Sequence, residues 1–261
     1  MESGTALADI LTGKENPSGA LTDCIARNYA DYPSSSSFGG KNYNAYTEDI
    51  YVGYRYFESF AKDKVLYPFG YGLSYTTFET QSETKQADDN VTVNVRVTNT
   101  GSLRGKHIVQ VYLGLPCGKL GNPVKALAGF AKTRTLEPGE SQTVTIEIDL
   151  REFASYDDSG ISGHKSCFIL EEGDYHIEVG SNVRDTKRVL TVRKETLEII
   201  RQVREVAAVK PGCGFNRLVN RNGKPHYEAV PTVQKDLKAI ILSELPQEIC
   251  ATSWDIPFSE V

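Results

Sequence analysis

The chain has no long hydrophobic run, no excess of positive charge and no visible targeting segment. No stretch approaches the roughly 18 apolar residues of a membrane-spanning helix. The 29 basic and 34 acidic residues are mixed and give a net charge of −5, so neither a membrane nor a nucleic acid is expected as a partner. No secretory signal follows Met1, and we therefore expect a cytoplasmic location. Met1 opens directly onto a helical pattern, which indicates a truncated start.

Residues that bind metals or act as nucleophiles are also scarce. Four histidines and five cysteines are scattered along the 261 residues. No Cys-x-x-Cys pair occurs and no histidine lies near a cysteine at ligand spacing, so we expect no metal site and no cofactor. The odd number and wide spread of the cysteines favour free thiols in a reducing compartment.

The residues that are present are typical of a globular protein. Hydrophobic residues make up 39% and charged residues 24% of the chain, and the length suffices for one large or two ordinary domains. Changes in pattern divide the sequence into three parts, with boundaries expected near residues 76 and 194.

The middle part, 77–194, carries the clearest pattern. A valine stands at every second position from 91 to 97, with polar residues between, which predicts a strand with one buried face. Some seven such short strands, separated by turn signals, are typical of an immunoglobulin-like sandwich. The fold class is therefore mainly β: a fibronectin III-like (immunoglobulin-like) β-sandwich, with a partial α/β segment before it and an irregular linker after it.

The first part, 1–76, looks like the end of a larger domain. Helical spacing is present at 6–11 and again at 48–60, with a long polar loop at 28–46 between them. The segment 48–78 contains ten aromatic residues, which usually mark a core or an interface. One helix and loops cannot bury so many rings, so we expect Tyr54, Phe57 and Phe69 to be exposed when the rest of the domain is absent.

The last part, 195–261, has weak periodicity and is punctuated by prolines. We interpret it as a linker that lies along other surfaces. The single tryptophan of the chain, Trp254, is expected to anchor it against a missing neighbour.

Several motifs, in order, resemble the family 3 glycoside hydrolases. An Ala-x-Ala-Asp-x-Leu helix and an Asn-Pro-Ser-Gly turn are similar to a segment of the second, α/β sandwich domain of that family. A Val-Gly-Tyr-Arg-Tyr-Phe motif and a Pro-Phe-Gly-Tyr-Gly-Leu-Ser-Tyr motif are similar to its close. Three further motifs are similar to the fibronectin III-like domain that follows. These motifs lie at 6–11, 16–19, 52–57, 68–75, 97–101, 109–112 and 136–141.

The resemblance implies a parent enzyme of the β-glucosidase type. Such an enzyme is a retaining β-glycosidase that removes terminal β-linked sugars from oligosaccharides or glycosides with a nucleophilic Asp and a general-acid Glu. Both residues are expected outside this chain, so the chain alone is predicted to be inactive and to support the active site and the domain packing. Its partners would be the missing catalytic barrel and, in the full enzyme, the glycoside. The long tail favours the reversed domain order, with the barrel last.

The candidates for the rim of the sugar site are Tyr43, Tyr46, Glu48 and Asp49, because tyrosine rings stack on sugars and polar groups bond to them. The adjacent acids at 48–49 and 157–158 are interpreted as helix-start or turn residues and not as a catalytic pair. Two alternatives stay open. One is a carbohydrate-binding module with surface aromatics such as Tyr112 or Tyr156, and the other is a structural spacer.

Overall fold

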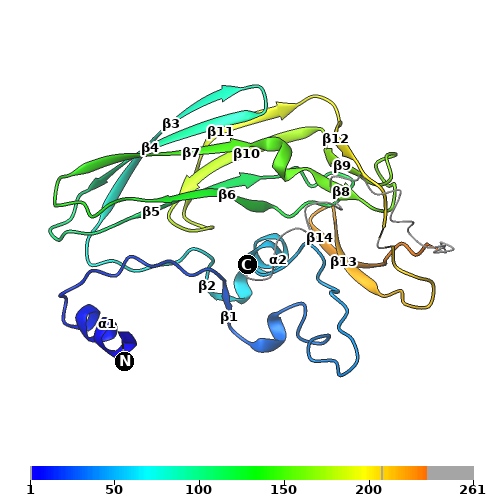
Figure 1. Cartoon of the computed structure of the whole chain (residues 1–261), viewed down its shortest axis with the longest axis horizontal. Helices are drawn as coiled ribbons and strands as arrows, with labels where there is room; N and C mark the ends of the chain where they lie inside the picture. Colours follow the sequence, from blue (N-terminus) through cyan, green and yellow to red (C-terminus); the bar gives the residue numbers. More distant parts are fainter. Residues whose placement is uncertain (1, 207, 234–261) are drawn as a thin grey trace, which may run out of the picture.

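The computed structural model describes residues 2–206 and 208–233. Trp254, predicted as an anchor, lies outside the described residues. Within them, two sheets pack face to face as a β-sandwich (Figure 1). One sheet has the order β3-β4-β7 and the other the order β11-β10-β5-β6, and every pairing is antiparallel. Their bounds are β3 (Phe78–Ala87), β4 (Asn90–Asn99), β5 (Ile108–Gly114), β6 (Lys125–Lys132), β7 (Ser141–Asp149), β10 (Gly173–Gly180) and β11 (Thr186–Lys194).

Strand β4 shows why this sequence forms a sandwich. Its alternating valines are at most 1% exposed, whereas the residues between them are partly or fully exposed. Val93 lies opposite Ile146 and Val95 opposite Val144 in the neighbouring strand, so both strands face the same core. Burying one such side chain stabilises the fold by roughly 1.5–3 kcal/mol. The predicted mainly β, fibronectin III-like class is confirmed.

A third sheet extends one end of the sandwich. It has the order β12-β9-β8 and follows a short 3-10 helix, η3. Leu170 of its central strand is 1% exposed and belongs to the core of the sandwich, and Ile200 of β12 packs against that core. The bounds are η3 (Leu150–Phe153), β8 (Ser155–Asp157), β9 (Cys167–Leu170) and β12 (Glu198–Gln202).

The N-terminal segment runs along the sandwich on the side of β5 and β6 (Figure 1). Its longer predicted helix, at 48–60, is only seven residues long, because Asp49 and Gly53 take positive φ angles of 50° and 57° that interrupt a helix. The elements are α1 (Glu2–Leu11), β1 (Ile25–Ala26), η1 (Tyr29–Asp31), α2 (Tyr54–Phe60), η2 (Lys62–Lys64) and β2 (Val65–Tyr67).

The prediction of exposed rings in this segment is wrong. Phe57 is fully buried in a small cluster of its own. The Tyr54 and Phe69 rings lie with their centroids 4.5 Å apart, and both contact the ring of Tyr112 on β5, at 6.3 and 6.5 Å. The sandwich therefore covers Tyr54 and Phe69, and the segment's own side chains cover Phe57. Neither pairing has a signal in the sequence.

Two polar contacts also hold the N-terminal segment on the sandwich. Gln110 on β5 is 3% exposed, and its amide donates to the carbonyl oxygens of Gly70 and Ser181 at 3.1 and 2.6 Å. Glu58 on α2 is 4% exposed and accepts from Arg184 Nε at 2.8 Å. Because a buried polar group without a partner is costly, these bonds specify one position for the segment.

The segment predicted as a linker contains regular structure in its described part. Strand β12 pairs with β9, and β13 (Asn216–Arg221) pairs with β14 (Lys224–Ala229) as a hairpin. The hairpin turn is Asn222-Gly223, with φ angles of 54° and 80°, as a type I′ turn requires. Leu218 is 1% exposed. Among the described residues, no helix is long and apolar enough to cross a membrane.

Candidate functional site

A cavity of about 380 Å³ lies where the three parts of the chain meet. One wall comes from residues 49–55, a second from the loops and short strands of the sandwich at 115–126 and 152–168, and a third from β13 of the hairpin. Cavities of this size are typical of small-molecule sites. Each wall is ordered by polar contacts between segments that are far apart in the sequence.

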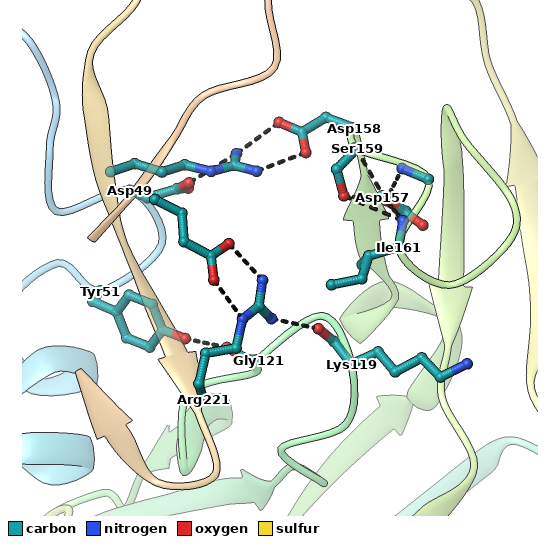
Figure 2. A network of polar contacts seen from close by, with 12 residues as sticks. Asp49, Tyr51, Lys119, Gly121, Asp157, Asp158, Ser159, Ile161 and Arg221 are labelled. Carbon is teal, nitrogen blue, oxygen red and sulfur yellow. Dashed lines mark hydrogen bonds and ion pairs between the residues drawn. The ribbon is translucent and has the colours of Figure 1, made fainter. Parts of the chain in front are cut away.

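Arg217 on β13 joins all three walls. Its two terminal nitrogens donate to the Asp158 carboxylate at 2.6 and 2.7 Å, and Nη1 also lies 3.1 Å from Asp49 Oδ2. These ion pairs join Asp49 and Asp158, both labelled in Figure 2, through one guanidinium. The side chains are 21–28% exposed, so water screens the pairs only in part. The bidentate geometry with Asp158 is the stronger of the two contacts.

Arg221, four residues further along β13, holds the hairpin on the sandwich. It donates to both oxygens of Glu228 at 2.7 Å and to the backbone carbonyl of Lys119 at 2.7 Å (Figure 2). The Tyr51 hydroxyl donates to the carbonyl oxygen of Gly121 in the same loop. Burial raises the pKa of this hydroxyl, so it stays a neutral donor.

The Asp157 carboxylate organises the loop on the opposite wall. It accepts hydrogen bonds from the backbone or hydroxyl groups of Ser159, Gly160, Ile161 and Ser162. Burial acts to raise its pKa, but the bonds from Ser162 and Gly160 outweigh burial and hold the pKa below its ordinary value. The adjacent acids at 157–158 therefore have separate structural partners, as a turn residue and an ion pair.

The four rim candidates do not form one group. Tyr43 and Tyr46 are 81% and 74% exposed on the polar loop. Asp49 lines the cavity and is paired with Arg217, and burial raises its pKa although Arg217 opposes the shift. Glu48 has one buried carboxylate oxygen with no partner among the described residues. Tyr46 and Asp49 also line a shallow neighbouring hollow, whereas Tyr43 lies apart from it.

Sequence reasoning missed the two arginines that close the cavity. An arginine in a polar tail is ordinarily interpreted as a solvated residue, and only the Asn222-Gly223 turn signalled a hairpin there. Of the aromatic residues proposed for sugar stacking, Tyr112 is completely buried, so that role for it is wrong. Tyr156 is 37% exposed and lies on the cavity wall.

Two family models match the chain in sequence order. Residues 1–75 match the glycosyl hydrolase family 3 C-terminal domain, and residues 107–183 match the fibronectin type III-like domain. The β-glucosidase of Ruminococcus albus is 44% identical over 252 residues, which are 97% of this chain and 26% of that protein. β-Glucosidase A of Butyrivibrio fibrisolvens is 50% identical over 206 residues, or 72% of this chain and 25% of that protein.

A solved structure shows the same arrangement. The crystal structure of a β-glucosidase from Paenibacillus barengoltzii superposes with a TM-score of 0.86 at 45% identity, covering 93% of this chain and 28% of that one. The chain thus spans about a quarter of the length of the relatives that it matches. With both family segments present in the order of the sequence, the chain belongs to family 3 of the glycosyl hydrolases, as the end of the C-terminal domain followed by the fibronectin type III-like domain.

Proposed function

We propose that this chain is the non-catalytic portion of a retaining β-glycosidase of the β-glucosidase type, which removes terminal β-linked sugars from oligosaccharides or glycosides. The observation that carries the proposal is the pair of family matches, in order, on one chain. The chain supports catalysis by holding the end of the α/β domain on the sandwich. The nucleophilic Asp and the general-acid Glu belong to the part of the enzyme that this chain does not contain.

The exposed face of the N-terminal segment is the surface on which we expect the missing catalytic barrel. Several large apolar residues are exposed on it, including Ile25 at 44%, Val52 at 60% and Leu66 at 49%. Exposed apolar groups gathered on one segment are typical of an interface. Tyr43, Tyr46 and Glu48 remain proposed rim residues, whereas Asp49 is bound to Arg217 and is better placed to hold the loop that carries them.

We also propose the reversed domain order, with the barrel last. It is supported by the tail, which the relative from Ruminococcus albus shares because its match covers 97% of this chain.

We further propose a cytoplasmic location, which is supported by the free thiols of the four described cysteines. Cys24 is among them, and burial first and the nearby Asp23 second raise its thiol pKa to about 12, so it is unreactive.

An exchange of segments tests the proposed function. The part of the Ruminococcus albus β-glucosidase that aligns with this chain is replaced by this chain, and hydrolysis of an aryl β-glucoside is measured. We expect the hybrid to be active and a version lacking the aligned quarter to be inactive. A hybrid that is folded and monodisperse but has no activity would contradict the proposal.

The rim assignment is tested in the same hybrid. Tyr43→Ala and Tyr46→Ala should raise KM, because rings that stack on the sugar contribute to its binding. Tyr227→Ala is a matched control, since Tyr227 is 58% exposed on the hairpin, outside the N-terminal segment. Unchanged kcat and KM in both rim variants would remove the rim role.

A further inference from the structure

We propose that the cavity between the N-terminal segment, the sandwich and the hairpin is a binding site for a neutral saccharide of one or two pyranose units. This inference goes beyond the proposed function and does not rest on it. It comes from the shape of the cavity, from an aromatic face on its wall and from polar groups with unused hydrogen-bonding capacity.

The size and the walls suit a sugar ring. A volume of about 380 Å³ lies at the lower end of the range for small-ligand pockets. Tyr156 is 37% exposed on one wall, and its ring is backed by that of Phe168 with the centroids 5.2 Å apart. A pyranose has an apolar C–H face and a rim of hydroxyl groups, so it matches a wall that pairs an aromatic face with polar groups.

One charged hydrogen-bond donor on the wall is unused. Arg55 lines the cavity and is partly buried, and its guanidinium has no hydrogen bond or ion pair with another described residue. Arg217 is not available in this way, because its terminal nitrogens are engaged by carboxylates and its Nε is buried out of reach of the cavity. A ligand hydroxyl oxygen inside the cavity would accept hydrogen bonds from the Arg55 guanidinium, which has five N–H donors.

Acceptors lie beside these donors. A carboxylate has about four acceptor positions, and Arg217 occupies only part of those of Asp49 and Asp158. Donors and acceptors side by side suit hydroxyl groups, each of which both donates and accepts. The charges on the walls are balanced. Arg55 and Lys119 are offset by Glu152 and by the second carboxylate on Arg217, and Arg221 is neutralised by Glu228. A neutral ligand is therefore favoured over an anion.

The frame around the cavity is already ordered, which lowers the entropic cost of binding. The Asp157 carboxylate holds one loop, and Arg221 holds the hairpin. Glu171, which is 5% exposed, accepts from the Lys119 backbone nitrogen at 2.6 Å and holds the loop between β5 and β6. Tyr156 and Arg55 thus project from fixed backbone.

The test is saturation-transfer NMR on the full chain with glucose, cellobiose and glucuronate, followed by titration to obtain Kd. We expect saturable binding of cellobiose or glucose, with the strongest transfer to ring C–H protons. Tyr156→Ala and Arg55→Ala should each weaken binding by roughly fivefold or more, while Tyr156→Phe should retain it. Phe130→Ala and Arg188→Ala are matched controls, because both residues are exposed on the sandwich away from the cavity.

Each result decides the proposal. Binding of a neutral sugar that both cavity variants weaken and both controls preserve supports it, provided that circular dichroism and melting show folded variants. Absence of saturable glucose and cellobiose binding overturns it. If the two cavity variants bind the sugar as tightly as the parent chain does, the ligand lies elsewhere and the proposal is overturned. Binding of glucuronate alone also overturns it, because the site would then be an anion site. None of these outcomes depends on glycosidase activity, so a failed hybrid enzyme and a failed sugar site are distinguishable.

Discussion

At the scale of single residues, Arg217 is the side chain on which the cavity depends most. Removing it leaves the carboxylates of Asp49 and Asp158 facing each other without a cation. Arg217→Met should lower the free energy of unfolding at pH 7 by about 2 kcal/mol. Arg193→Met is the matched control, because its pair with Asp174 is about half exposed and surface pairs contribute little. Urea unfolding of both variants measures the difference.

The deficit of Arg217→Met should depend on pH. Burial already raises the pKa of Asp49, and Arg217 opposes that shift, so the variant raises the pKa further. A raised pKa in the folded state gives stability that is present at low pH and is lost as the pH rises through that pKa. The deficit should therefore be smaller at pH 4 than at pH 7. An equal deficit at both values would mean that the lost contacts, and not the carboxylate charges, determine it.

Asp157 has the opposite pH dependence. Its folded pKa lies below the ordinary value, because the hydrogen bonds from the loop outweigh burial. The stability that it contributes is present above the ordinary pKa of about 4 and is lost as the pH falls through the folded pKa. Asp157→Asn should cost about 2 kcal/mol at neutral pH, and the gap to the parent chain should narrow below pH 4. A gap that stays constant between pH 7 and pH 3 would contradict this role.

At the scale of elements, the hairpin depends on a close backbone contact with the loop between β5 and β6. Gly121 has a φ of 71°, and a Cβ there would lie 2.5 Å from the carbonyl oxygen of Asn220. Gly121→Ala should therefore displace the hairpin and increase amide hydrogen exchange at 216–229. Gly139→Ala is a matched control, because Gly139 has a φ of 80° and open space around it. Gly139→Ala introduces backbone strain without a close contact, so amide hydrogen exchange at 216–229 should be unchanged in this variant. Equal exchange in the two variants would show that the contact at Gly121 is unimportant.

The elements also show what the sequence could and could not predict. Strand β4 was predictable because its valines alternate strictly. This alternation can be recognised in the sequence of β4 alone, without knowing which strands pair with it. The docking of Tyr54 on Tyr112 was not, because it depends on a contact between residues whose side chains carry no pairing signal. The hairpin had one local signal, Asn222-Gly223, but its arginines became recognisable as cavity residues only once folding placed them beside Asp49 and Asp158.

At the scale of the whole molecule, the adjacent acids at 48–49 and 157–158, which both lie in the described part of the chain, do not form free carboxylate pairs for glycoside chemistry. Glu48 and Asp49 differ in their surroundings, and Asp49 is engaged by Arg217. We expect the isolated chain to give no turnover of aryl β-glucosides above the buffer background, with Glu48→Gln indistinguishable from the parent. A turnover that Glu48→Gln abolishes would show that this chain contains a catalytic acid.

The ion pair between Glu58 and Arg184, which are 126 positions apart, has a consequence for how the protein is made. A chain leaves the ribosome from its N-terminus, so the aromatic segment emerges well before β10 and β11, which flank its anchoring arginine. Until then the segment lacks this anchor, and incompletely packed segments are prone to aggregate and are substrates for chaperones. Contacts so distant in sequence also slow folding. Slowing translation of the codons for residues 77–194 should therefore lower the yield of native protein, whereas the fold of the protein that does form should be unchanged.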